Sequence, residues 1–117
     1  MRMPRPGELR DPVLIRRRRD LPLAGGLLDP EFIEGREADA KIEPVGTAVY
    51  LAGVQTDGRI THRVFIRAEL GAGIDGDCEV VDEDSLVYRV HRRGDIAGAR
   101  RFVVLEVEEL GPEERYG

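Results

Sequence analysis

The sequence predicts an all-β protein, a small β-barrel or sandwich of about six strands with at most one short helix. The first observation is that polarity in the stretch 59–67 (RITHRVFIR) alternates with a period of two. One face takes Ile60, His62, Val64 and Ile66, and the other takes Arg59, Thr61, Arg63, Phe65 and Arg67. The same pattern recurs at 86–92 and 101–108, so we expect short strands whose outward faces carry charge.

Composition supports one modest core. The chain has 117 residues, of which 41% are hydrophobic, and this predicts a single domain. Aromatic residues make up 5% and Trp is absent, so the core is expected to consist of Val, Ile and Leu rather than of a ring-lined ligand cavity. Charged residues reach 35%, and the net charge of -5 argues against nucleic-acid binding over the whole surface. The net charge does not exclude binding of nucleic acid by a local basic patch.

Cysteine usage and the N-terminus bear on the compartment. Cys78 is the only cysteine, so the sequence excludes an internal disulfide and a Cys-based zinc site, and a reducing cytoplasm is the simplest compartment. The N-terminal MRMPRPGELR is not followed by an apolar signal region, and no apolar run approaches 18 residues. Neither secretion nor membrane insertion is expected.

The first third of the chain predicts an arm, a strand and a long irregular segment. Residues 1–11 hold two prolines and three arginines without periodic apolar positions, which predicts an extended N-terminal arm. Residues 12–19 predict a first strand that leaves the sheet as an exposed basic edge. Residues 20–35 are expected to be irregular, and they contain the apolar residues Leu21, Leu23, Leu27, Leu28, Phe32 and Ile33. These form either an interaction surface or a β-hairpin folded back on its own core.

The remaining elements follow from turn signals. A second strand is expected over 38–45, then a short helix over 47–54 with Thr47 as its N-cap, and a turn at Asp57-Gly58. A glycine-rich loop at 71–76 precedes a hairpin whose strands lie near 78–81 and 86–92, and 93–98 is expected to turn into the last strand. The organisation is therefore an arm (1–11), a barrel domain (12–110) with a long loop (20–35), and an acidic tail (111–117).

Two motifs imitate ligand sites. GAGIDG at 71–76 matches the dinucleotide pattern, but strand-like acidic residues follow it where a helix would have to begin, so we expect no cofactor. The acidic residues over 75–84 resemble a cation site, yet an EF-hand loop starting at Asp75 would need glycine at Val80 and glutamate at Leu86. A solvated acidic loop, without metal, is the interpretation.

No catalytic constellation is visible. His62 and His91 are the only histidines, and neither has a nucleophile or second ligand at a recognisable spacing. His62 lies on the apolar strand face, where a hydrogen-bonded core histidine is expected. Ser85 lies in a turn, and Arg93-Gly94-Asp95 is interpreted as a turn rather than an adhesion motif. We predict that the protein is not an enzyme.

Charge is divided between the two ends of the chain. Residues 1–20 hold seven arginines and three acids, whereas 104–117 hold five acids and one arginine. This division suits head-to-tail contacts between copies, which close into rings when the rotation permits. The candidate residues are Arg16, Arg17, Arg18, Arg19, Glu106, Glu108 and Glu109. The alternative is a basic stripe for nucleic acid, formed with Arg92, Arg93, Arg100 and Arg101, although aromatic residues for base stacking do not accompany it.

The order of these segments resembles the head-tail joining proteins of tailed bacteriophages, also called head-closure or stopper proteins. The resemblance spans residues 7–110 and rests on GELRDPVLIRRR (7–18), AKIEPVG (40–46), THRVFIR (61–67) and LVYRVHRRGDIAGARRFVVLEVEEL (86–110). The chain departs from many relatives in segment 20–35, which is richer in Leu and acid, and in GAGIDGDCEVVDED (71–84).

The resemblance implies an SH3-like β-barrel with an extended arm, in a homo-oligomeric ring with six copies favoured over twelve. Such a ring lies in the virion neck between the portal-bound adaptor and the tail terminator, is assembled in the host cytoplasm, and closes the head after packaging. It implies that segment 20–35 reaches the channel and helps to hold the DNA without sequence-specific binding. The alternative function is a small SH3-like or OB-like module that binds nucleic acid or protein.

Overall fold

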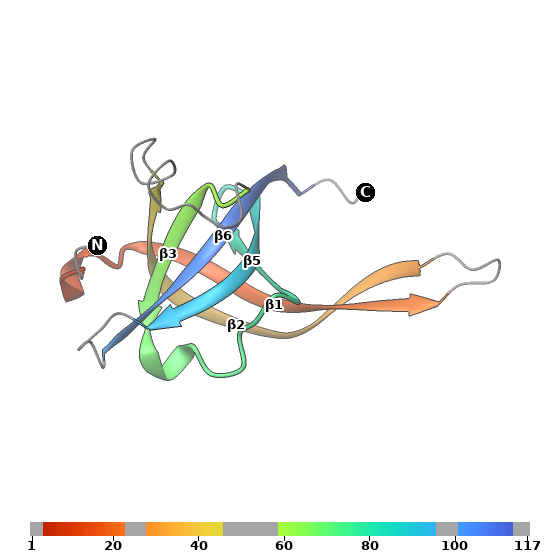
Figure 1. The fold of residues 1–117 in the computed structure, drawn as a ribbon, viewed down its shortest axis with the longest axis horizontal. Helices are drawn as coiled ribbons and strands as arrows, with labels where there is room; N and C mark the ends of the chain where they lie inside the picture. The colour runs from red at the N-terminus through yellow and green to blue at the C-terminus, as the bar shows by residue number, and fades with distance from the viewer. Residues whose placement is uncertain (1–3, 23–27, 46–58, 96–100, 114–117) are drawn as a thin grey trace.

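The computed structural model describes residues 4–22, 28–45, 59–95 and 101–113. Within these ranges the elements are η1 (Pro6–Glu8), β1 (Asp11–Pro22), β2 (Leu28–Pro44), β3 (His62–Arg67), η2 (Ala68–Leu70), β4 (Cys78–Asp82), β5 (Leu86–Asp95) and β6 (Phe102–Pro112). All strand pairs are antiparallel, and they close a barrel in the order β1-β2-β3-β6-β5-β4 (Figure 1). The predicted all-β fold is confirmed.

The barrel interior is filled by small and β-branched side chains. Alternate residues of each strand point inward, and the buried cluster contains Val13, Ile15, Ala38, Ala40, Val64, Ile66, Ile74, Cys78, Val80, Tyr88, Val90, Val103, Leu105 and Val107. Closure depends on β1, because its residues from Val13 to Arg17 pair with β4 while the same strand pairs with β2 on its other edge. The expected Val, Ile and Leu core is therefore present, with Ala where β2 passes the interior.

Part of the outward face of β3 and β6 is apolar, whereas the sequence predicts a face that carries charge; Arg63 and Glu106 keep the expected charge further along the same strands. Phe65 lies opposite Val104 in the register and is fully buried, and Phe102 and Val104 are buried too. The N-terminal residues reach this side, since Glu8 Oε2 lies 3.5 Å from Nζ of Lys41, the register partner of Phe65 on β2. The alternation places Phe65 outside the barrel, but an outward side chain is exposed only where no other segment covers it.

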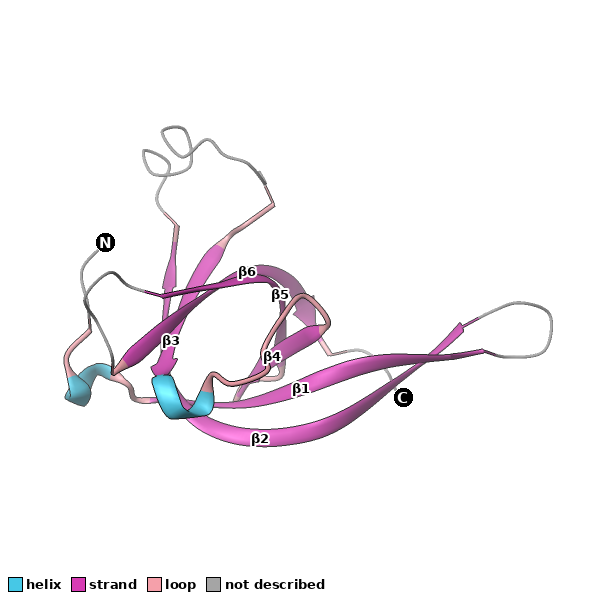
Figure 2. Cartoon of the chain, turned by 60° about the horizontal axis from the view of Figure 1, so that its bottom comes forward, coloured by secondary structure: helices cyan, strands magenta, loops and turns pink. Residues whose placement is uncertain are grey.

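Strands β1 and β2 continue beyond the barrel as a two-stranded ribbon (Figures 1 and 2), which we call the arm. Its register runs from Arg17 opposite Ile33 to Pro22 opposite Leu28. The expectation of irregular chain over 20–35 is therefore wrong for 20–22 and 28–35. The hairpin alternative has the right form, but the ribbon projects from the barrel rather than folding back, and the molecule measures 48 × 30 × 24 Å. Prolines fit here because each strand of a ribbon has one edge without a ladder partner.

The predictions for turns and loops agree with the structure in some places and not in others. The glycine-rich loop leads into strand β4 and not into a helix, so the dinucleotide motif lacks its phosphate-binding element. Arg93 to Asp95 continue β5, and the expectation of a turn is wrong there. The predicted helix over 47–54, the Asp57-Gly58 turn and residues 114–117 lie outside the described residues. Within the described ranges no helix has the length and apolarity needed to cross a membrane.

The burial of Phe65 gives the first prediction. Replacing Phe65 with Ala should lower the free energy of unfolding by about 3 kcal/mol or more, because a large side chain without solvent exposure is removed. Arg67→Ala is the matched control on the same outward face of β3, where the side chain is exposed, and it should cost within about 0.5 kcal/mol. Urea unfolding measures both. Equal effects would show that the outward face of β3 is solvated.

Candidate interaction site at the root of the hairpin arm

A partly buried ionic cluster lies where the arm leaves the barrel. Arg16 of β1 is opposite Glu79 of β4 in the register. Its Nη2 and Nε donate to Glu79 Oε1 at 2.9 and 3.3 Å, and its Nη1 and Nη2 donate to the two carboxylate oxygens of Glu113 at 2.9 and 3.0 Å. The side chains of Arg16 and Glu79 are only 11% and 8% exposed. We call Arg16, Glu79, Glu113 and Phe32 the arm root.

Phe32 covers the face of the same guanidinium. Cζ of Arg16 lies 3.7 Å from the ring centroid of Phe32, which belongs to the arm portion of β2. Burial alone would lower the pKa of Arg16, but the hydrogen bonds and charges of Glu113 and Glu79 outweigh it and raise the pKa. The guanidinium is thus held at its edges by the barrel and on its face by the arm.

This cluster changes the interpretation of the divided charge. Arg16 from the basic N-terminal part and Glu113 from the acidic C-terminal part meet within one chain, at 2.9 Å. Both charges therefore have a partner inside the subunit. For all of the candidate residues, Arg16 included, the intersubunit contact stays a prediction.

The three candidate glutamates also pair within the chain. Glu106 forms an ion pair with Arg92 of β5, and Glu108 Oε1 lies 3.0 Å from Nε2 of His91. Glu109 is more loosely placed, with Oε1 3.9 Å from Nε2 of His62 and its side chain 39% exposed. Of these glutamates, Glu109 has the carboxylate most accessible to another protein.

Outward charges of opposite sign alternate across the strands. One row runs Arg16, Glu79, Arg89 and Glu108 over β1, β4, β5 and β6, and another runs Glu43, Arg63, Glu106 and Arg92 over β2, β3, β6 and β5. Cross-strand neighbours of opposite charge stabilise an antiparallel sheet. These eight charged residues thus belong to the outer wall of the barrel itself.

Three arginines hold the glycine-rich loop against one end of the barrel. Arg17 donates to the carbonyl oxygen of Gly73 and pairs with Asp75 at 3.1 Å. Arg36 donates to the carbonyl oxygens of Leu70 and Ala72 at 2.9 and 3.0 Å, and Arg93 to that of Gly71 at 2.7 Å. Ile74, 5% exposed, joins the core from this loop.

Sequence reasoning missed Arg36 and Arg93 in this role. Their signal is indirect: a loop rich in glycine has few polar side chains to satisfy its own carbonyl groups, and arginine is the side chain with the most donors. At the same loop, the main-chain N–H of Asp77, followed by the charge of Arg17, holds the pKa of Asp75 below its ordinary value. The acidic residues of this loop are thus used in local structure.

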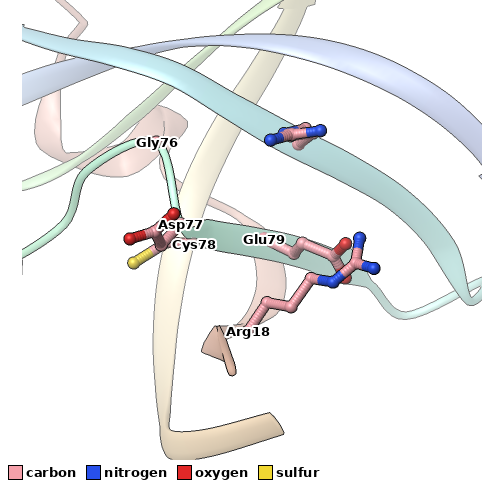
Figure 3. Close-up of a pocket in the computed structure, with 6 residues that line it drawn as sticks. Arg18, Gly76, Asp77, Cys78 and Glu79 are labelled. Carbon is pink, nitrogen blue, oxygen red and sulfur yellow. The ribbon is translucent and has the colours of Figure 1, made fainter. Parts of the chain in front are cut away.

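A pocket of about 240 Å³ lies beside the arm root (Figure 3). It is lined by Arg18, Gly76, Asp77, Cys78, Glu79 and Arg89. The main-chain N–H of Arg18 donates to the carbonyl of Asp77 at 2.8 Å, and Arg18, Arg19 and Arg89 are exposed. Side chains of both charge signs line the pocket. In the part of the chain that is described, no group of His, Cys, Asp or Glu is arranged to hold a metal ion.

The other end of the barrel carries His62 and Tyr88. Their rings meet edge to face with centroids 5.3 Å apart, and Nδ1 of His62 lies 2.9 Å from Oγ1 of Thr61. His62 is hydrogen-bonded as expected, but its side chain is 20% exposed, so its interpretation as a core residue is wrong. It lies where β3 begins, and the barrel end leaves it partly open to solvent.

Comparison with known proteins identifies the family of this barrel. The family model of the phage head completion protein matches residues 4–110. The chain belongs to this family. Protein SF1141 from Shigella flexneri 2a, known from a solution structure, is similar in fold with a TM-score of 0.65 and 18% sequence identity, over 90% of this chain and 96% of that one. No curated protein matches the sequence. Membership implies a virion component that assembles with other virion proteins.

The structure describes some of the apolar residues that are predicted to form a docking surface in this head completion protein. Phe32 and Ile33 are half-buried near the base of the arm, and Phe32 contacts Arg16. Leu21 and Leu28 belong to the outer ends of β1 and β2. Leu23 and Leu27 lie outside the described residues. The docking role of these residues stays a prediction.

The Tyr88 hydroxyl of this head completion protein yields a pH prediction. Burial, reinforced by the charges of Asp82 and Glu109, raises the pKa of Tyr88 to about 12. An unfolded tyrosine titrates near pH 10, so between pH 10 and 12 the unfolded state loses the phenol proton first and becomes favoured. The free energy of unfolding should fall by about 2 kcal/mol from this group over that window.

Tyr88→Phe is the control, because it removes the hydroxyl that titrates while keeping the aromatic ring. Its stability, measured by denaturant unfolding at each pH, should lack that part of the alkaline fall. A constant difference between wild type and Tyr88→Phe from pH 9 to 12 would contradict the raised pKa.

Proposed function

We propose that this chain is a head-closure (stopper) protein of the phage neck. It forms a ring between the portal-adaptor complex and the tail, retains packaged DNA, and provides the surface to which the tail attaches. The observation that carries the proposal is the family match over 4–110 on a closed barrel with a protruding arm. The role is structural and not enzymatic, and it uses no cofactor.

The arm supports assembly with copies of the same chain. Beyond Arg17 the register of β1 with β4 ends, and β2 pairs with β3 only from Lys41 to Pro44, so in the described part of the chain each arm strand has one edge without a ladder partner. A two-stranded ribbon is marginally stable alone in water. A neighbouring subunit is the natural cover for such edges, and repeated heterologous contacts of this kind close into a ring.

The charges suit a wall that surrounds DNA without binding it tightly. The net charge is -5, and Arg16, Arg17, Arg36, Arg92 and Arg93 are bound to carboxylates or carbonyls of their own chain. Phosphate affinity grows with the number of available cations, and a tightly held genome could not be ejected. We therefore place the DNA in the channel without sequence-specific contacts, and favour six copies over twelve.

The test is assembly with a connector. Purified chain mixed with its portal-adaptor complex should form an additional ring, seen by electron microscopy and as a mass increase by light scattering, and the added ring should then bind the tail terminator. Failure to bind the connector under assembly conditions would contradict the proposal. Oligonucleotide affinity that falls steeply with salt would instead favour the nucleic-acid-binding module.

Deleting residues 21–33 gives a sharper prediction. The barrel pairs of β1, β2 and β4 lie largely outside this segment, so the variant should keep cooperative unfolding but lose ring formation or DNA retention. Asp84→Ala, in the exposed turn between β4 and β5, is the control and should assemble as the wild type does. Loss of cooperative melting in the deletion would show instead that the arm is part of the folding core.

A further inference from the structure

We infer that Arg16 is a positioning residue, which sets the direction in which the arm leaves the barrel and links that direction to the C-terminal end of β6. The inference concerns the isolated subunit. It rests on the proposed function only where the arm is used in assembly.

The backbone alone leaves the direction of the arm weakly determined. The β1–β2 register shifts between Ile15 and Arg17, because Glu34 and Gly35 of β2 together face Arg16. A β-bulge of this kind bends a ribbon and increases its twist. Past the bulge the register of β1 with β4 ends at Cys78, and the hydrogen bond from Arg18 N to Asp77 O extends the main-chain contact by one residue. Side chains must therefore contribute to holding the angle.

Arg16 lies at the bulge and contacts three separate parts of the chain. Four hydrogen bonds attach the guanidinium edges to Glu79 of β4 and to Glu113 after β6. Glu113 is itself fixed, since its main-chain N–H donates to the carbonyl of Ser85 at 2.8 Å. Phe32, on the arm side of the bulge, lies on the guanidinium face at 3.7 Å. A change in arm angle would move Phe32 away from this face.

Arginine is the side chain that this arrangement needs. A planar guanidinium can hold two carboxylates at its edges and an aromatic ring on its face at the same time, whereas a lysine ammonium has no flat face and no paired donors. The side chains of Arg16 and Glu79 are nearly buried, so their mutual orientation is little weakened by water.

Hydrogen exchange on the free chain tests the inference. Phe32→Leu keeps apolar bulk but removes the ring, so amides in 18–22 and 28–31 should exchange about tenfold faster. Amides of β3 and β6 should change by less than about twofold. Ile33→Leu, on the opposite face of the same strand, is the matched control and should leave arm exchange as in the wild type. Arg16→Lys and Glu113→Gln should accelerate arm exchange in the same selective way.

Two results would overturn the inference. One is arm exchange at the wild-type rate in Phe32→Leu and Arg16→Lys. The other is an increase by the same factor in the arm and the barrel, which would mean that Arg16 acts on overall stability alone. Because this measurement needs no ring, failure of connector binding would contradict the proposed function while leaving the exchange result as it stands.

Discussion

Strand β1 belongs to two structures at once, and the architecture depends on this. From Val13 to Arg17 it closes the barrel against β4, whereas from Arg18 to Pro22 its ladder partner among the described strands is β2 alone. The last β1 residue that pairs with β4 therefore sets where the barrel ends and the arm begins. The barrel is stabilised by its buried core, whereas a two-stranded ribbon encloses no interior, so side chains at the point where the two structures divide must help to set its geometry.

Five arginines of the described residues are bound to groups of their own chain and so serve the fold. Loop carbonyls at one barrel end are satisfied by Arg17, Arg36 and Arg93, and cross-strand carboxylates occupy Arg16 and Arg92. The glycine-rich loop has few polar side chains of its own to satisfy these carbonyls, and unsatisfied carbonyls are costly. Part of the high charge content therefore serves hydrogen bonding within the chain.

Period-two alternation was enough to predict the barrel strands, because β3, β4 and β5 each have an inward face of Val, Ile or Tyr. It could not predict the arm, because Pro22 and Pro30 are signals for irregular chain unless one knows that their strand edges lack a ladder partner. It also could not place Arg16, since Glu79 and Glu113 are 63 and 97 residues away along the chain. Alternation in a sequence indicates which face of the sheet a residue occupies. Its partners on that face depend on the order and register of all the strands in the closed sheet.

The ionic cluster of the arm root constrains the direction of the arm, which an apolar cluster of similar stability would not do. Burying an arginine and its carboxylates, even in part, costs desolvation free energy, so such clusters contribute less net stability than their number of hydrogen bonds suggests. Apolar contacts, however, are non-directional and would tolerate a range of arm angles. Hydrogen bonds to Glu79 and Glu113 together with the Phe32 stack constrain both the plane and the rotation of the Arg16 guanidinium. If the arm contacts a neighbouring copy as proposed, an arm already held in one direction loses less conformational freedom on binding, and this favours repeated identical contacts.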